Sequence, residues 1–164
     1  MGIITPEDAV DYGLSGPSLR ASGVAYDVRR TDPYSIYDRF DFEVATETEC
    51  DSLARYYVRM QEIRESMKIV EQALEGLPEE PLKYKLPAVF KVPEGEVYYH
   101  IESARGDLGV YLVSDGTAKP YRLKWRAPSY INLQVLAQMV RGWKIADVVA
   151  ILGSLDVVLG EVDR

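Results

Sequence analysis

The chain has 164 residues, of which 47% are hydrophobic, so it is long enough to bury about two-thirds of its unfolded surface in one globular domain. Its formal charge of −7 and pI near 4.8 argue against a protein that grips the phosphate backbone of nucleic acids, which needs clustered, unopposed Lys and Arg. Cys50 is the single cysteine, which excludes an internal disulfide and a metal site built only of cysteines, and fits a reducing compartment.

The first helix is predicted close to the N-terminus. Thr5 supplies an N-cap, Pro6 takes the first helical position, acidic residues fill the first turn, and Gly13 marks the end. Glycines and prolines then interrupt residues 16–33, where we expect irregular backbone. That stretch carries Arg20, Arg29 and Arg30.

Two amphipathic patterns follow. Phe40, Phe42 and Val44 alternate with acidic residues, which predicts a short strand with one buried face. A helix about 40 Å long is predicted over residues 49–75, with a capping box in residues 46–49 and its end at Gly76. Its large apolar residues form one stripe at alternating three- and four-residue steps: Leu53, Tyr56, Met60, Ile63, Met67, Val70 and Leu74. Such a stripe is also typical of a coiled-coil dimer, but its tyrosine and methionines favour irregular bundle packing.

A proline-rich connector at residues 78–95 separates a helical lobe, residues 1–77, from a second lobe, residues 96–164. Four prolines impose extended backbone on the connector: Pro78, Pro81, Pro87 and Pro93. The longest apolar run in the chain is far below the roughly 20 residues that cross a bilayer, and no signal-peptide pattern opens the sequence. We therefore expect any membrane association to occur through partners.

The second lobe begins with strands and ends with helices. Alternating or apolar segments at residues 97–102, 108–113 and 121–125 predict a three-strand antiparallel meander. Two helices follow around a break at Gly142, and the chain ends in an acidic tail that we expect to be buried against something. The predicted fold class is α+β: a long amphipathic helix, a small antiparallel β meander and C-terminal helices.

Autonomous catalysis has little support in the sequence. His100 is the only histidine and lacks any neighbouring metal-ligand spacing, so a hydrogen-bonded structural histidine is favoured. Cys50 lies near a helix start, but acidic neighbours oppose a thiolate. The glycines at 106 and 109 precede a strand pattern and not a helix, which excludes a dinucleotide-binding loop.

Arg105 lies among acidic residues at a predicted turn. Gly106 next to it lets another backbone approach closely, and an arginine in such surroundings suits an ion-pair network. The residue physics alone favours a structural role, in which Arg105 ties Glu102, Asp107 or Asp115 together at the turn.

Seven short stretches are informative together: GPSLRASGV (residues 16–24), DPY (32–34), YDRFDF (37–42), RYYVRM (55–60), ESARG (102–106), SDG (114–116) and GEVDR (160–164). In this order and at these separations they resemble signature stretches of the D subunit of respiratory complex I. That subunit is hydrogenase-like and helps form the quinone pocket of NADH:quinone oxidoreductase. The resemblance spans nearly the whole chain and implies a fold that is part of the nickel-iron hydrogenase large-subunit-like fold.

The resemblance covers only the C-terminal part of that subunit, which is more than twice as long as this chain. It implies that the N-terminal part, whose hairpin histidine meets the quinone headgroup, is not in this sequence. The connector is also shorter than is usual in the family. We therefore expect an incomplete quinone site and an inactive isolated chain.

Nickel-iron hydrogenases hold their metal with two Cys-x-x-Cys pairs, and Val158 and Glu161 stand at the positions of the C-terminal pair. Neither residue replaces a thiolate for nickel, so a hydrogenase function is excluded. The resemblance implies instead that the former metal cavity has become part of a quinone chamber. Its wall would include Asp156, Val158 and Leu159, with Arg105 and Ser114 as support.

The resemblance also implies the surroundings of the chain. This chain would bind no cofactor itself; quinone would be the substrate of the complex, and the terminal iron-sulfur cluster would lie in a small partner subunit. Further partners would be the N-terminal part of the same subunit and other complex I subunits, but not nucleic acid. The location would be peripheral, on the cytoplasmic (or matrix or stromal) side of an energy-transducing membrane.

Two questions stay open at this point. Val158 would act by shape, as an apolar wall for a flat ring and tail, whereas Asp156 would either act by charge near the quinone or simply pair with Arg164 or Arg105. The second question concerns the whole chain, because a non-catalytic assembly or interaction module derived from the same subunit fits the sequence as well.

Overall fold

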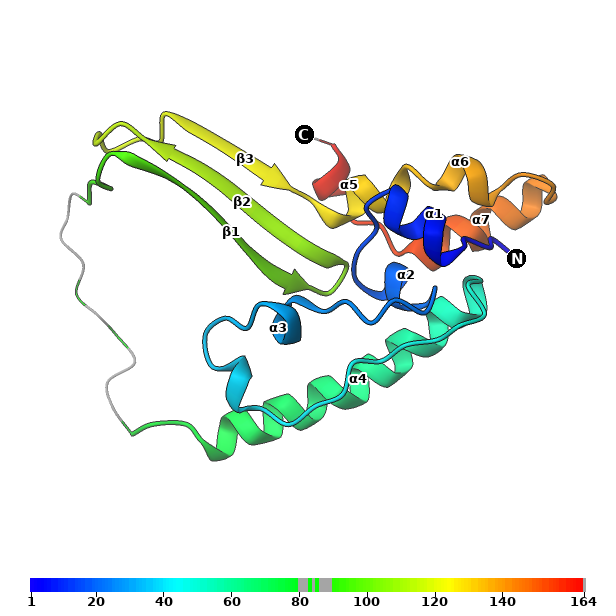
Figure 1. The fold of residues 1–164 in the computed structure, drawn as a ribbon, viewed down its shortest axis with the longest axis horizontal. Helices are drawn as coiled ribbons and strands as arrows, with labels where there is room; N and C mark the ends of the chain where they lie inside the picture. The colour runs from blue at the N-terminus through cyan, green and yellow to red at the C-terminus, as the bar shows by residue number, and fades with distance from the viewer. Residues whose placement is uncertain (80–82, 84, 86–89, 164) are drawn as a thin grey trace.

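A computed structural model describes residues 1–79, 83, 85 and 90–163 of the chain (Figure 1). The elements are α1 (Pro6–Asp11), α2 (Pro17–Arg20), α3 (Val28–Thr31), the 3-10 turn η1 (Tyr37–Arg39), α4 (Ser52–Glu75), β1 (Gly95–Ser103), β2 (Gly106–Ser114), β3 (Arg122–Arg126), α5 (Pro128–Leu133), α6 (Leu136–Met139), α7 (Ile145–Leu155) and α8 (Leu159–Val162). The predicted α+β class, with a long helix, a three-strand sheet and C-terminal helices, is confirmed.

The main hydrophobic core joins the two ends of the chain. It is built from Ile4, Ala9, Leu14, Leu19, Val135, Met139, Ile151 and Leu155, and α1, α2, α6 and α7 gather at one end of the molecule (Figure 1). Residues of both predicted lobes therefore share one core. The division into lobes at the connector remains a prediction, and Pro81, Pro87 and Arg164 lie outside the described residues.

The helix α1 forms for the predicted reasons, since the Thr5 side chain accepts a hydrogen bond from the Asp8 backbone N–H. The start of α4 differs from the predicted capping box. Cys50 has a positive φ of 61°, which turns the chain just before the helix, and Asp51 becomes the N-cap by accepting from the backbone N–H groups of Leu53 and Ala54. Gly76 ends the helix as predicted.

The large apolar residues of α4 lie mainly on the side of the helix that is turned away from the rest of the chain. Leu53, Tyr56, Met60, Ile63, Met67, Val70 and Leu74, named here the α4 seam, are between 37% and 68% exposed. The inward face carries smaller apolar residues, and Ala54 and Val58 pack against Ala21 and Ala45. A surface helix of a soluble protein normally turns its large apolar face inward, so the orientation of α4 is reversed.

The predicted strand at residues 40–44 is wrong, because the segment is extended but pairs with no strand in the described structure. Its backbone instead pairs with side chains of α4. Asp41 N–H donates to Gln72 Oε1 at 2.8 Å, and Gln72 Nε2 donates to Asp41 O at 2.8 Å. Glu43 N–H donates to Glu65 Oε2 at 2.9 Å. These bonds satisfy polar backbone groups that a sheet would otherwise satisfy.

The sheet has the order β1-β2-β3, with both pairs antiparallel, and extends away from the core (Figure 1). Residues paired across neighbouring strands lie on the same face of the sheet, so the register gives the sheet one apolar face and one polar face. The apolar face carries Val97, Tyr99, Ile101, Leu108, Val110, Leu112, Leu123 and Trp125, and the polar face carries Tyr98, His100, Tyr111, Arg122, Lys124 and Arg126. The predicted meander is confirmed.

Short helices account for most of the remaining differences. Residues 16–33, predicted as irregular, contain α2 and α3, and the first predicted C-terminal helix is split into α5 and α6. Gly142, with φ of 80°, marks the predicted break before α7. Within the described ranges, no helix is both long and apolar enough to cross a membrane.

Candidate functional site

Arg105 and Asp156 meet where the β1–β2 turn reaches the end of α7. Arg105 Nη2 lies 3.3 Å from Asp156 Oδ1, and Arg105 Nε donates to Asp156 O at 3.3 Å. Asp156 is in the left-handed conformation, with φ of 54° and ψ of 50°, which is strained for a residue other than glycine. This geometry makes Asp156 the partner of Arg105. The predicted partners Glu102, Asp107 and Asp115 are wrong.

A second arginine approaches Asp156 from α4. Arg59 Nε lies 3.8 Å from Asp156 Oδ2, which is an ion pair but too long for a hydrogen bond. The Arg59 guanidinium also donates to Leu155 O at 3.2 Å, the last residue of α7. Burial lowers the pKa of Arg59, although the charge of Asp156 opposes this. Asp156 therefore lies between two arginines from different elements.

Backbone contacts fix the position of Arg105. The buried Asn132 side chain on α5 donates to Arg105 O at 3.1 Å and to Ser15 O at 3.3 Å, and accepts from Ser15 N–H at 3.2 Å. Gly16 and Gly106 cross so closely that a Cβ added to Gly16 would lie 2.5 Å from Gly106 Cα. The turn that carries Arg105 is therefore held against the loop before α2.

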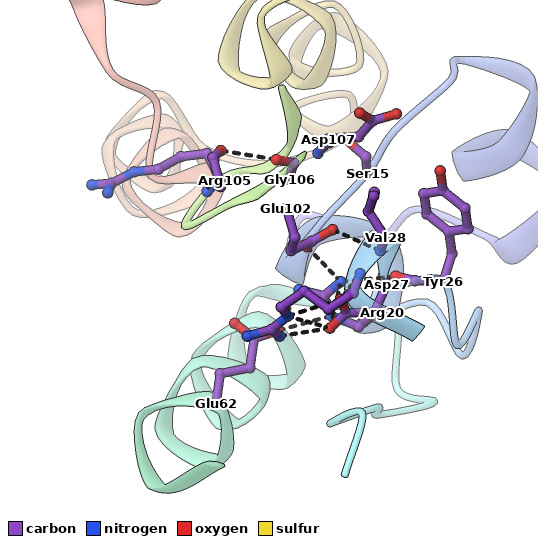
Figure 2. Close-up of polar contacts among 12 residues, drawn as sticks. Ser15, Arg20, Tyr26, Asp27, Val28, Glu62, Glu102, Arg105, Gly106 and Asp107 are labelled. Carbon is purple, nitrogen blue, oxygen red and sulfur yellow. Dashed lines mark hydrogen bonds and ion pairs between the residues drawn. The ribbon is translucent and has the colours of Figure 1, made fainter. Parts of the chain in front are cut away.

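Next to this pair lies a buried network around Arg20, which is 1% exposed. Figure 2 shows carboxylates that converge on Arg20 from α4, from the sheet and from the start of α3. Arg20 Nη2 lies 2.6 Å from Glu62 Oε1, and Arg20 Nη1 lies 2.8 Å from Glu102 Oε1 and 3.9 Å from Asp27 Oδ2. Arg29 Nη2 lies 2.6 Å from the same Asp27 oxygen. A single arginine thus ties together three elements distant in sequence.

The network shifts the ionisation of its members in different directions. Burial lowers the pKa of Arg20, but the charges of Glu102, Glu62 and Asp27 outweigh it and raise that pKa. Burial and the charge of Asp27 raise the pKa of Glu102 against the attraction of Arg20. The pKa of Asp27 is lowered, because hydrogen bonds and charge from Arg29 exceed the effect of burial. Of Glu102 and Asp27, Glu102 is therefore the carboxylate whose pKa the fold raises.

The two clusters border one hollow of about 360 Å³. It is lined by Arg20, Arg29, Arg59, Glu62, Ile63, Ser66, Glu102, Ser103, Ala104 and Asp156. Its polar wall combines arginines and carboxylates in close pairs. Such a wall can orient a polar headgroup by hydrogen bonds and can hold or release a proton at a carboxylate.

Val158 and Leu159 follow Asp156 but do not line this hollow. The backbone N–H of Val158 donates to Ser129 Oγ at 3.1 Å, and Glu161 accepts from Ser129 N–H at 3.0 Å, so the tail docks on the first turn of α5. Leu159 is 75% exposed, and no residue of α8 is buried. Burial of the tail remains a prediction that would require residues outside this chain.

Ser114 lies at the far end of β2 from Arg105. The nine-residue strand places them about 26 Å apart along the sheet, and the Ser114 hydroxyl donates to Val92 O at 2.9 Å. The structure therefore brings Arg105 and Asp156 together but leaves Ser114 apart. A supporting role for Ser114 near Asp156 has no geometric basis in this chain.

The two residues considered for catalysis have structural surroundings. His100 Nδ1 lies 3.0 Å from Asp107 Oδ1, and His100 Nε2 lies 3.1 Å from Asp32 Oδ2, as expected for a hydrogen-bonded histidine. Burial and the charge of Glu49 raise the pKa of the Cys50 thiol, which disfavours a thiolate. Among the described residues, no three His, Cys, Asp or Glu side chains form a group that could hold a metal ion.

Sequence reasoning missed Arg59, Glu62 and Asn132 as parts of this region. Arg59 and Glu62 fit the pattern of solvent-facing charges on an amphipathic helix, and Asn132 lies within an apolar helical pattern. One available signal was the inclusion of Arg59 in the RYYVRM stretch. The long-range pairing of Glu62 with Arg20 left no local pattern.

The chain is similar to known proteins along its whole length. It matches the family described as respiratory-chain NADH dehydrogenase, 49 Kd subunit, over residues 1–89 and 84–164. The D subunit of the NADH-quinone oxidoreductase of Desulforamulus reducens is 53% identical over 99% of this chain and 44% of that protein. The H subunit of the NAD(P)H-quinone oxidoreductase of Acaryochloris marina is 50% identical over all of this chain and 48% of its own length.

A solved structure is also similar to this chain. A chain of the membrane-bound sulfane sulfur reductase, an archaeal respiratory membrane complex, superposes with a TM-score of 0.92 at 45% identity. The match covers all of this chain and 46% of that one. The chain thus spans less than half the length of each of these relatives.

Proposed function

Since the chain belongs to the family of the 49 Kd subunit of respiratory-chain NADH dehydrogenase, we propose that it forms the C-terminal part of the quinone-pocket subunit of an NADH:quinone oxidoreductase. In this role it helps enclose the chamber where quinone is reduced, beside the terminal iron-sulfur cluster of a small partner subunit. The names of the relatives from Desulforamulus and Acaryochloris support quinone as the acceptor. The remainder of the subunit completes the chamber.

The observation that carries this proposal is the meeting of Arg105, Arg59 and Asp156 at the edge of the hollow. Asp156 has a strained backbone and a side chain that is 42% exposed, so the fold holds an accessible carboxylate between two cations. Two arginines hold this carboxylate in place through ion pairs. Val158 lies two residues beyond it and outside the lining of the hollow. In the proposed chamber, which the remainder of the subunit completes, its apolar side chain would shape the wall for a flat ring.

The proposal includes partners and a location. The partners are the remainder of the subunit, the small iron-sulfur subunit, other complex I subunits and quinone, with no cofactor bound by this chain. The complex lies at an energy-transducing membrane, with this subunit peripheral on its cytoplasmic, matrix or stromal side. The isolated chain is expected to have no quinone reductase activity.

A second acceptor follows from the structural relative, whose name specifies sulfane sulfur reduction. Quinone is favoured because relatives named for quinone reach 53% identity, against 45% for the sulfane sulfur reductase chain. Membrane complexes that contain this chain should reduce a short-chain quinone analogue faster than polysulfide. The opposite order would replace quinone by sulfane sulfur in the proposal.

The test of the chamber is a Val158→Met substitution in the complete membrane complex. A longer side chain at the wall should lower quinone reductase activity by about tenfold or change sensitivity to quinone-site inhibitors, since a methionine obstructs the space of a ring. Val149→Met is the matched control, because Val149 is an exposed valine of α7. Normal activity and inhibition in an assembled Val158→Met complex would remove Val158 from the chamber.

The alternative is an assembly module without a redox role, and the exposed α4 seam is the observation that favours it. Under this alternative, substitutions at Asp156 and Val158 would leave quinone reduction unchanged, whereas removal of the chain would prevent assembly. Blue-native gels of the same variants, read beside the activity, separate the two functions.

A further inference from the structure

A groove of about 970 Å³ runs along β3, the strand at one edge of the sheet (Figure 1). All five residues of β3 line this groove, although successive side chains of a strand point to opposite faces of the sheet. The groove therefore follows the outer edge of β3 and takes in both faces beside it. It shares no lining residue with the hollow at Asp156, so it is a separate site.

The outer edge of β3 has backbone groups that are free to pair. β3 pairs with β2 on one side only, and no described segment outside the sheet hydrogen-bonds to its backbone. The outward N–H and C=O groups of such an edge strand form a template for a further strand. Peptide recognition by strand addition uses an edge of this kind.

The polar face of β3 carries three cations in a row: Arg122, Lys124 and Arg126. Arg126 Nη1 lies 3.6 Å from Asp107 Oδ2. Arg122 and Lys124 are exposed, and neither forms an ion pair with any residue that the structure describes. The described lining of the groove contains no Asp or Glu. The groove is therefore basic, within a chain whose formal charge is −7.

Aromatic and apolar side chains complete the groove. Tyr98 and Tyr111 line it from the neighbouring strands, and Tyr130 lines it from α5. Leu123 and Trp125, on the apolar face of β3, are 46% and 48% exposed. Charges alone are enough to protect an edge strand from chance pairing, so protection does not account for exposed apolar side chains beside them. Basic and apolar side chains together fit a surface that is covered by a partner.

We propose that β3 is the docking site for an extended acidic segment of another polypeptide, which adds to the sheet as a fourth strand. Residues paired across neighbouring strands lie on the same face of the sheet. Acidic residues at every second position of the segment therefore lie beside the three cations, and the apolar residues between them lie beside Leu123 and Trp125. The pattern recognised is an alternation of acidic and apolar residues over about five positions, or about 17 Å. This inference goes beyond the proposed function, because the groove is separate from the hollow at Asp156.

Two other occupants fit the groove less well. In a second copy joined through its own β3, an antiparallel pair centred on Lys124 would place Lys124 opposite Lys124 and Arg122 opposite Arg126. Like charges directly opposite each other destabilise a strand pair. A nucleic acid would also be attracted by the cations, but the formal charge of −7 repels a long polyanion. A nucleic acid also has no peptide groups to pair with the edge of β3.

The experiment measures, by fluorescence anisotropy, the affinity of the full 164-residue chain for a labelled peptide of about nine residues in which glutamate alternates with valine. Lys124→Glu should weaken binding at least about tenfold, because it places a like charge opposite an acidic residue. Lys119→Glu is the matched control, since Lys119 is also exposed but lies outside the groove. It changes the net charge equally and should leave the affinity within about twofold. Circular dichroism and thermal unfolding establish that both variants are folded.

Two modified peptides test strand addition with the unaltered chain. One carries N-methyl groups at its glutamates and the other carries them at its valines, so that each blocks one edge of the added strand. At least one of them should bind at least about tenfold more weakly than the parent peptide, because a methylated nitrogen cannot donate to the carbonyls of β3. Equal binding of all three peptides would overturn strand addition.

Three other results would overturn the inference. The wild-type chain could fail to bind the alternating peptide, which would leave the cations of β3 as protection of the edge. Lys124→Glu and Lys119→Glu could weaken binding equally, which would indicate attraction by net charge without a site. A labelled thymidine oligonucleotide could bind more tightly than the peptide and lose its affinity in Lys124→Glu, which would favour nucleic acid. Each of these results leaves the test of Val158 and the proposed function unchanged.

Discussion

Gly16→Ala tests whether the crossing of two glycines holds the candidate site in place. Gly16 has φ of 66° and ψ of −150°, a region of backbone conformation that is essentially restricted to glycine and costs about 1–3 kcal/mol for other residues. The added Cβ would also lie 2.5 Å from Gly106 Cα and 2.6 Å from Arg105 O. Both neighbours are backbone, so the overlap must move a chain segment, at a further cost of about 1–3 kcal/mol.

The expected loss in the free energy of unfolding is therefore about 2–6 kcal/mol, which is a large part of the total stability of a domain. Two control substitutions separate the cost of the backbone conformation from the cost of the steric overlap. Gly116→Ala has a similar φ of 80° but no atom within 4 Å of its Cβ, so it should cost only about 1–2 kcal/mol. Gly153→Ala lies within α7 in open space and should stabilise by about 0.5–1 kcal/mol.

The assay is urea unfolding of the 164-residue chain followed by circular dichroism. Equal m-values across the three variants would license a direct comparison of their midpoints. If Gly16→Ala costs no more than Gly116→Ala, the crossing relaxes without strain. The inference that it fixes the position of Arg105 would then be wrong.

Two further predictions concern charged groups in other parts of the fold. Burial lowers the pKa of His100, but hydrogen bonds to its two aspartate partners outweigh this effect and raise the pKa. The protonated histidine therefore stabilises the folded state. This contribution is complete below about pH 6.5 and is lost as pH rises through the folded-state pKa. The difference in unfolding free energy between wild type and His100→Gln should thus shrink as pH rises above about 6.5, and a constant or growing difference would contradict the shift. Arg55 is 0% exposed, burial lowers its pKa to about 10, and it donates to Gly2 O at 2.7 Å and Ser154 Oγ at 2.9 Å. Arg55→Met should lower the free energy of unfolding by about 2–4 kcal/mol, because the loss of hydrogen bonds from a charged group costs more than is gained by no longer burying that charge. The control Arg64→Met, at an exposed position, should change it by no more than about 0.5 kcal/mol. Equal unfolding midpoints for the two variants would refute this prediction.

Local sequence patterns predicted the helices and strands that local interactions form. The start of α1 follows from the Thr5 side chain, and the three strands follow from alternation between turns. The apolar stripe on α4 was also predicted, but the direction in which it faces was not. Periodicity shows that one face of a helix is apolar and does not show whether that face packs against this chain. Phe42 illustrates the same limit: it is 3% exposed, as a half-buried strand would require, yet its segment pairs with α4 side chains and not with a strand.

The candidate site was predictable in part for a comparable reason. Asp156 and Arg105 were proposed from the resemblance, and the structure brings them together. The partners of Arg105 favoured by sequence proximity were wrong, because Glu102 is taken by Arg20 and Asp107 by His100 and Arg126. Ion pairs between residues 42 or 82 positions apart, as in the Arg20 network, depend on the tertiary fold and leave no trace in local spacing.

The core that joins both ends of the chain constrains how the protein folds during synthesis. Residues such as Ile4 and Leu14 are buried against Val135, Met139 and Ile151, so their partners are translated long after them. Contacts over such long sequence separations form slowly, because the intervening chain must first be closed into a loop. On the ribosome, α4 and the sheet emerge while the N-terminal segment still exposes its apolar side chains, and the nascent chain is open to aggregation until α7 is complete.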